Sequence, residues 1–467
     1  MCLFVSSSGC RFCLNYSLNR TDYGPNLTCM RVITLPLSHT RMKTSWLHLK
    51  CKKVIFFVGF TLALLIYCFT ISFLKVKGVQ NGGKRAKKEI SEMPRLTAKY
   101  GINCTRIYEM EPVEVAKTLV IRKQKSYVEP TDEIIVNATS DCDQFVSSLG
   151  YDAIQVTESE REFPLAYSLV VHRNAALVER LLRAVYVPHN IYCIHYDRKS
   201  STDFMLAMNG LARCIPNVFI ASKLERVQYA GISRLRADLN CLSDLLDSEV
   251  KWKYVINLCG QDFPLRTNAE LVSDLKGLKG RNMVESKWPG AKNRRWSVHH
   301  LLKNKKFEFY NTPVSTSDKK RPPPYDIEMF VGSAYFTLSR EFVYFVHWSY
   351  LARNFLAWSE DTFSPDEHFW ATLVRVPGVP GEVPRSEADI SELISKTRLV
   401  KWSAFEGRLY PRCTGVHVRK ICIYGAAELR WLLNYGHWFA NKVDPKVDPV
   451  LIECLEEKLA EKRRSFH

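Results

Sequence analysis

The sequence predicts an α/β domain in which a parallel β-sheet is covered by helices on both faces. From about residue 163 onward, short apolar segments alternate with amphipathic helical segments, a pattern typical of β-α units. With 467 residues, 46% of them hydrophobic, the chain can bury a large core. An uncharged segment of 21 residues, Val54 to Leu74, precedes this domain and is long enough to cross a bilayer as a helix.

The expected strands and helices follow one another in a regular order. Their apolar residues recur with the period of a strand or of one helical face. Strands are expected at 166–172, 191–196, 217–222 and 254–258, with helices at 177–186 and 232–246 and a short helix before the third strand. No internal repeat is apparent.

The carboxyl ends of these strands carry the first candidate ligand-binding residues. In a parallel sheet, ligands bind just beyond these ends. For any one of these polar residues an ordinary turn is the better explanation, but their shared position strengthens the prediction of a site. The residues are His172, His195-Tyr196-Asp197 and Gly260-Gln261-Asp262.

Several classes of function are excluded by motif and charge. The sequence contains neither G-x-G-x-x-G nor a Walker A motif, which argues against dinucleotide-binding and P-loop enzymes. Residues 1–53 and 75–100 hold 13 of the 18 net positive charges, so the body of the protein gives little support for nucleic-acid binding. Asp141-Cys142-Asp143 is the one Asp-x-Asp triplet, and we assign it no metal role because it precedes the first strand.

The 21-residue apolar segment is best interpreted as an uncleaved membrane anchor. It exceeds the usual apolar region of a signal peptide, and no small-residue cleavage site follows it. Five Lys or Arg residues lie within fifteen residues on its amino side and six on its carboxyl side, so the positive-inside rule does not decide the orientation.

Cysteines and glycosylation triplets indicate the orientation better. Nine of the fifteen cysteines follow the anchor without a CxxC pair, which favours four disulfides and one free thiol over zinc ligation. Asn103 and Asn137 begin N-glycosylation triplets on the same side. We therefore expect a type II membrane protein with a cytoplasmic tail (1–53, with Met42 as an alternative start), an anchor (54–74), a stem (75–103) and a lumenal domain (104–467).

A helix is expected to begin at Ser364-Pro365-Asp366-Glu367, and two interpretations of Glu367 compete. Ser364 before Pro365, with Glu367 three residues after the serine, has the spacing of a capping box. Alternatively, Glu367 is a general base that the positive end of the helix dipole keeps ionised. Spacing alone favours the capping box, and both interpretations stay open at this point.

Aromatic and charged residues accumulate after residue 280. Carboxylates accept hydrogen bonds from sugar hydroxyls, and aromatic rings cover apolar sugar faces. Scattered tryptophans are more often core residues than sugar platforms. The candidates are Glu285, Lys292, Arg294-Arg295-Trp296, Trp358, Trp370 and Trp402.

Several motifs together resemble one known family, the core 2 / I-branching β-1,6-N-acetylglucosaminyltransferases. The resemblance runs from about Cys104 to Cys454, and the segment from Ile423 to Trp431 most resembles the third core 2 subtype. The motifs are residues 163–172 (FPLAYSLVVH), 195–199 (HYDRK), 237–241 (ADLNC), 254–264 (YVINLCGQDFP), 364–370 (SPDEHFW) and 439–442 (FANK).

The resemblance implies a GT-A-like fold with a Rossmann-like nucleotide-binding half, in the Golgi membrane. It implies an inverting, metal-independent transfer of GlcNAc from UDP-GlcNAc, in β-1,6 linkage, to the GalNAc of Galβ1-3GalNAc on Ser or Thr of mucin-type glycoproteins. One alternative is I-branching, with galactose of polylactosamine as the acceptor. Another is a non-catalytic Golgi protein that binds O-glycans. Whether the protein forms a homodimer is left open.

The resemblance also implies roles for individual residues. Asp197 and Tyr229 would lie at the uridine, Arg419 and Lys442 at the diphosphate, and Glu367 would be the base. Two fixed cations can replace a metal beside the leaving group, so no cofactor is expected. Glu285, Lys292, Arg295 and Trp402 would contact the acceptor. The implied disulfides are Cys104–Cys454, Cys142–Cys214, Cys193–Cys241 and Cys413–Cys422, with Cys259 free.

One position departs from the family pattern. Family members commonly carry an aromatic residue two positions after the acceptor tryptophan, where this chain has Ala404. The resemblance therefore implies one ring fewer on the acceptor side, which affects acceptor affinity or preference.

Overall fold

The computed structural model describes residues 96–124, 127–302 and 312–465. The predicted tail, the alternative start at Met42, the anchor and most of the stem lie outside the described residues. Within the described ranges, no helix is both long enough and apolar enough to cross a membrane. Helix α2 (Leu96–Lys99) belongs to the end of the predicted stem, and the Thr97 N–H donates to the Glu453 carboxylate at 2.9 Å. The folded part therefore includes residues 96–103.

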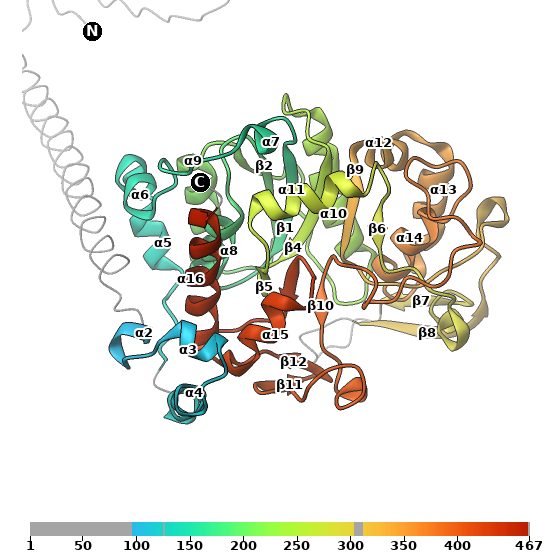
Figure 1. Cartoon of the computed structure of the whole chain (residues 1–467). Coiled ribbons are helices and arrows are strands. Elements are labelled where there is room, and N and C mark those ends of the chain that lie inside the picture. Colours follow the sequence, from blue (N-terminus) through green and yellow to red (C-terminus); the bar gives the residue numbers. More distant parts are fainter. Residues whose placement is uncertain (1–95, 125–126, 303–311, 466–467) are drawn as a thin grey trace, which may run out of the picture. The chain divides into compact units, whose positions relative to one another are not determined.

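A six-stranded sheet with the order β3-β2-β1-β4-β9-β6 forms the centre of the domain (Figure 1). Its first four strands are parallel, as the alternation of segments predicts, and they begin and end close to the expected positions. Their bounds are Leu165–Val171 for β1, Ile191–Tyr196 for β2, Val218–Ile220 for β3 and Tyr254–Cys259 for β4.

The sheet is mixed, and the expectation of a parallel sheet is wrong at one edge. Strand β9 (Phe336–Ser339) pairs antiparallel with both β4 and β6 (Met283–Val284). These two strands have four and two residues, too few for a period-two pattern to be recognised in the sequence. Their pairing with β4 depends on contacts that are distant along the chain.

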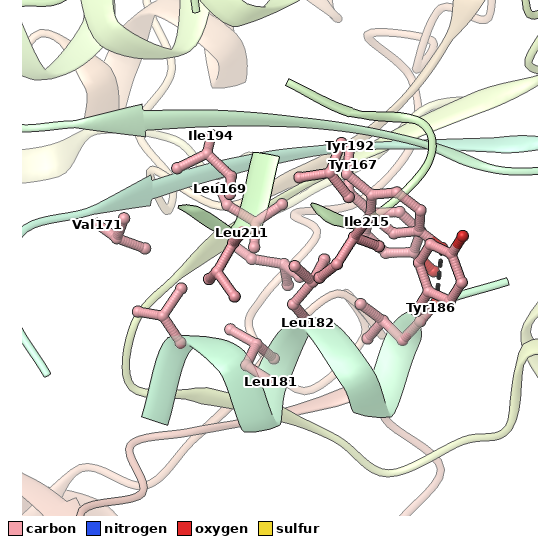
Figure 2. Close-up of a cluster of buried hydrophobic side chains, with 14 of the residues drawn as sticks. Tyr167, Leu169, Val171, Leu181, Leu182, Tyr186, Tyr192, Ile194, Leu211 and Ile215 are labelled. Carbon is pink, nitrogen blue, oxygen red and sulfur yellow. Dashed lines mark hydrogen bonds between the residues drawn. The ribbon is translucent and has the colours of Figure 1, made fainter. Parts of the chain in front are cut away.

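Alternating side chains of the sheet enter two separate hydrophobic clusters. Tyr167, Leu169 and Val171 of β1 point to one face and pack against α8 (Ala175–Val185) and α9 (Thr202–Cys214), as Figure 2 shows. Ala166 points to the other face, which is covered by α10 (Ile232–Asp247), α12 (Arg340–Trp348) and α14 (Asp366–Leu373). Helices on both faces explain why β1 is buried along its whole length.

A third cluster joins the beginning and the end of the domain. It contains residues of α3 (Cys104–Tyr108), α15 (Leu429–Asn434) and α16 (Pro449–Ser465). A three-stranded sheet with the order β10-β13-β5 lies beside it. The bounds of these strands are Leu399–Val400 for β10, Phe439–Asn441 for β13 and Asp262–Pro264 for β5.

The remaining elements lie around these layers. Two antiparallel hairpins are formed by β7 with β8 and by β11 with β12. The bounds are α4 Pro112–Gln124, α5 Glu133–Ala138, α6 Cys142–Leu149, α7 Glu158–Arg161, α11 Asn268–Gly277, η1 Gly290–Arg295, β7 Val298–Leu302, β8 Pro313–Lys319, η2 Pro324–Asp326, α13 Tyr350–Trp358, η3 Ser359–Asp361, η4 Ser403–Phe405, β11 Val416–Val418, β12 Ile421–Ile423 and η5 Ala426–Glu428.

Four disulfides tie these layers together, and their pairing is the one that the family resemblance implied. Cys104–Cys454 joins α3 to α16, and Cys193–Cys241 joins β2 to α10. Cys142–Cys214 joins α6 to α9, and Cys413–Cys422 joins the segment before β11 to β12. Cys259 is the free cysteine of the described residues.

Candidate active site

A cavity of about 1100 Å³ lies at the carboxyl ends of the parallel strands. His172, Asp197, Gly260 and Gln261 line it, as expected from their positions after β1, β2 and β4. The structure thus places a ligand-sized cavity where an α/β sheet is expected to have one.

Three residues predicted at the same edge do not line the cavity. His195 is buried, its Nε2 accepts the Glu225 N–H at 2.8 Å, and burial lowers its pKa to about 4. The Asp262 carboxylate accepts the Cys259 N–H at 2.7 Å and lies 3.2 Å from the Arg398 guanidinium. The Tyr196 hydroxyl accepts a bond from Asn209. These three side chains have structural roles, because their polar atoms are engaged by other groups of the protein.

The four residues predicted at the donor all line the cavity. The Asp197 carboxylate accepts the backbone N–H groups of Lys199, at 2.9 Å, and Val227, at 3.2 Å. These bonds tie the end of β2 to the loop before α10. The Tyr229 ring is 57% exposed and lies 5.0 Å from the Arg419 guanidinium carbon. Arg419 and Lys442 both line the cavity and bring two cations to it.

Glu367 lies in the first turn of α14 and lines the same cavity. Its carboxylate pairs with the Arg295 guanidinium. The positive end of the helix and the neighbouring guanidinium both favour a negative charge at this position. Glu367 therefore has the electrostatic surroundings that a general base needs.

The predicted capping box at Ser364 is wrong. Ser364 has a left-handed φ of 48° instead of the extended conformation of a cap residue, and its N–H donates to the Ala230 carbonyl at 2.8 Å. Pro365 precedes α14 without a side-chain cap bond. Because the Ala230 carbonyl holds the Ser364 N–H, the Glu367 carboxylate does not fold back onto the helix end and faces the cavity.

Asp366 is a cavity residue that spacing did not reveal. It is buried, and burial, together with the charge of Glu367, raises the pKa of Asp366 to about 7, while Arg234 opposes the shift. Arg234 lines the cavity as well and pairs with the buried Asp238 of α10. The i, i+4 spacing of Arg234 and Asp238 is the one sequence signal for this network.

The residues predicted at the acceptor also converge on the cavity. Glu285, Lys292, Arg295 and Trp402 all line it. Two further charged residues, Lys287 and Glu392, line it beside them and were not predicted.

The tryptophans divide between core and cavity. Trp296 and Trp370 are buried in the hydrophobic core, as the alternative interpretation held, whereas Trp402 is partly exposed at the cavity wall. Ala404 is exposed in η4, where Trp402 and Phe405 on either side of it line the cavity.

The acidic triplet near residue 141 has a structural role. The Asp141 carboxylate caps α6 by accepting the Gln144 N–H at 3.1 Å. In the described ranges, one group has the spacing of metal ligands, and it lies elsewhere, at Glu406, Cys413 and Cys422. Its two cysteines are joined in a disulfide and supply no thiolate.

Comparisons with known proteins agree on one family. The model of the Core-2/I-Branching enzyme family matches residues 165–433. A Danio rerio protein named beta-1,3-galactosyl-O-glycosyl-glycoprotein beta-1,6-N-acetylglucosaminyltransferase 4 is 62% identical, over 78% of this chain and 85% of its own length. Its Mus musculus namesake is 58% identical, over 79% and 81%. The human transferase numbered 3 is 45% identical, over 78% and 84%.

Solved structures add little to these comparisons. A 4-diphosphocytidyl-2C-methyl-D-erythritol synthase from Anaerococcus prevotii has 9% identity and a TM-score of 0.22 over 42% of the chain, too low to bear on function. The family model covers more than half of the chain, and the relatives are similar over most of their own length. The chain therefore belongs to the Core-2/I-Branching enzyme family.

Proposed function

We propose that this protein transfers GlcNAc from UDP-GlcNAc, in β-1,6 linkage, to the GalNAc of Galβ1-3GalNAc on Ser or Thr, and so forms core 2 branches of mucin-type O-glycans. One observation carries the proposal: the nine residues that the resemblance assigns to donor, acceptor and catalysis all line a single cavity. The names of the relatives support the acceptor class and the linkage.

The proposed mechanism is a single displacement that inverts the anomeric carbon. Glu367 takes the proton of the attacking 6-hydroxyl, and its carboxylate pairs with Arg295 and lies at the positive end of α14. Negative charge develops on the UDP leaving group as the bond to the sugar breaks. Arg419 and Lys442 stabilise that charge as fixed cations, so we propose that no metal is required.

The proposed donor site uses the nucleotide-binding half of a GT-A-like fold. Asp197 follows the carboxyl end of β2, and Tyr229 lies in the loop before α10. Both line the cavity. Tyr229 offers an exposed ring on which the uracil of the donor can stack, and Arg419 lies against that ring. The uridine and the diphosphate would therefore bind to adjacent parts of the cavity.

The comparisons bear on the subtype. Identity to the two relatives numbered 4 is 62% and 58%, against 45% to the human enzyme numbered 3. We propose the core 2 activity that these names share. The higher identities favour the fourth subtype over the third, which the segment from Ile423 to Trp431 most resembles.

We further propose that the protein is a type II Golgi membrane protein anchored by residues 54–74, which lie outside the described residues. The four disulfides suit an oxidising lumen. Asn103 is exposed at the start of α3, whereas Asn137 is partly buried in α5. Protease protection in sealed microsomes, with glycosidase digestion of the protected fragment, tests the orientation and both acceptors.

The activity is tested with the full-length protein, UDP-GlcNAc and Galβ1-3GalNAc. We expect a β-1,6-linked product that persists in EDTA. A strict manganese requirement would contradict the role of the two cations. Faster transfer to lactosamine chains would favour I-branching, and glycan binding without any transfer would favour the non-catalytic alternative.

A further inference from the structure

Three charged side chains form a compact group on the acceptor side of the cavity. The Lys287 ammonium lies 2.6 Å from the Glu285 carboxylate and 3.1 Å from the Glu392 carboxylate. The side chains of Glu285, Lys287 and Glu392 are only 12%, 27% and 15% exposed. A cation between two largely buried carboxyl groups is an arrangement in which their proton affinities are coupled.

Backbone pairing holds this group in place. Ser286, between Glu285 and Lys287, exchanges two hydrogen bonds of 2.9 Å with Ile390, which brings the chain before Glu392 alongside. On the other side, Lys287 exchanges bonds of 2.8 and 2.9 Å with Val331. The three charges are therefore fixed relative to one another by a sheet-like extension of β6.

The group contains one positive and two negative charges, so one carboxyl group is disfavoured as a carboxylate. Burial raises the pKa of Glu285 to about 7, with Lys287 opposing the shift and Glu392 adding to it. Burial also acts to raise the pKa of Glu392. The net shift of that pKa is downward, because the Glu392 carboxylate accepts a hydrogen bond from its own backbone N–H and lies beside the Lys287 ammonium. Near neutral pH, Glu392 carries the charge and Glu285 exchanges a proton.

Two further titratable groups packed against this pair, Tyr410 and His437, stay neutral near pH 7. Tyr410 is buried next to Glu392, and burial raises the pKa of its hydroxyl well above the usual value. The His437 Nε2 lies 2.9 Å from the Glu392 carbonyl oxygen, and burial lowers the pKa of that imidazole. Arg375, which donates to the Ser286 carbonyl, is a further cation beside the group. Lys287 and Glu392 are the charges that act most strongly on Glu285.

We infer that Lys287 and Glu392 are positioning residues for acceptor binding, because together they decide whether Glu285 meets the acceptor as a carboxylate or as a neutral carboxyl group. The inference rests on the proposed function, in which Glu285 contacts the acceptor glycan. A carboxylate accepts charge-assisted hydrogen bonds from sugar hydroxyls, which are about twice as strong as neutral ones. Acceptor binding thus favours ionised Glu285 and weakens as this residue takes up a proton.

The test is the pH dependence of the KM for Galβ1-3GalNAc, measured with the full-length protein and saturating UDP-GlcNAc. In the wild type, this KM should rise below pH 7 by up to about tenfold per pH unit, because one proton competes with the acceptor. Glu392→Gln removes a negative neighbour and should move this rise to lower pH. Lys287→Met removes the cation and should move it to higher pH, with the KM for UDP-GlcNAc unchanged in both variants.

Glu387→Gln is the matched control, because Glu387 lies five residues before Glu392 in an exposed ion pair with Arg281. Its pH profile should equal that of the wild type. A flat acceptor KM in an active wild type, or shifts of the two test variants in the same direction, would overturn the inference. Absence of any transfer by the wild type would instead count against the proposed function. If one test variant does not fold, the wild-type profile and the other variant decide.

Discussion

Replacing Gly332 with alanine tests whether the positions of the proposed base, Glu367, and of the acceptor residue Glu285 depend on one close backbone contact. Gly332 is buried between helix α14 and the segment of Glu285 that follows β6, and its N–H donates to the Glu367 carbonyl at 2.8 Å. An alanine Cβ at this position would lie 1.7 Å from the Glu285 carbonyl oxygen and 3.2 Å from the Ala371 Cβ. The carbonyl is backbone and cannot rotate away.

The structure gives the size of the displacement. Ordinary contact begins at 3.4 Å, so the two segments must separate by about 1.7 Å to admit the methyl group. Since a misplacement of 1 Å can cost about 100-fold in rate, kcat/KM for transfer should fall at least about 100-fold, or about 2.7 kcal/mol. Overpacking should also lower the free energy of unfolding by about 1–3 kcal/mol.

The assay compares kcat/KM and the thermal unfolding midpoint of Gly332→Ala with those of the wild type. Gly277→Ala is the control, because a Cβ at this exposed position at the end of α11 meets nothing within 4 Å. The control should retain wild-type activity and gain up to about 1 kcal/mol in stability. Wild-type values of both quantities for Gly332→Ala would refute the reasoning, since the contact would then not constrain the site.

Three further predictions address the base, a buried cation and a buried acid. Glu367→Gln should lower kcat by about 10²–10⁴-fold, the usual contribution of a general base, with UDP affinity unchanged by calorimetry; near-normal turnover would sink the assignment. Arg375 is buried and donates to Ser286, Pro384, Glu387 and Ala388. Arg375→Met should therefore lower the free energy of unfolding, measured with denaturant, by about 3 kcal/mol or more, because it leaves buried carbonyls unpaired. The control Arg385→Met removes an exposed ion pair and should lower it by at most about 1 kcal/mol. The pKa of Asp366 is raised from 3.8 to about 7, so the folded protein binds this proton more tightly than the unfolded chain, and the wild type should lose stability as the pH rises from about 4 to 7. Asp366→Asn should reduce this loss by the share of Asp366, while Glu285, whose pKa is also raised to about 7, keeps its own share. Equal pH dependence of both proteins would contradict the prediction.

Local patterns predicted the central part of the fold. The strand at 191–196 and the helix at 232–246 match β2 and α10 closely, because alternating and helical periodicity is a property of neighbouring residues. The short strands β6 and β9 were missed, since their pairing with β4 joins segments too short to show a period.

For the site, the resemblance to a family succeeded where spacing did not. Asp197, Glu367 and Lys442 are far apart in the sequence, and no local pattern says that they share a cavity. Spacing at Ser364 predicted a capping box, which a hydrogen bond to the distant Ala230 prevents.

The sequence by itself determined the parallel strands and the main helices around them and, through its motifs, the nine residues that the resemblance assigns to the candidate site. The tertiary structure alone decided what surrounds each of them. Glu392 lies near Glu285 only because Ile390 pairs with Ser286, and Asp366 is buried only because α14 packs against the sheet. Proton affinity depends on burial and on neighbouring charges, and both are set by contacts between residues that are distant along the chain.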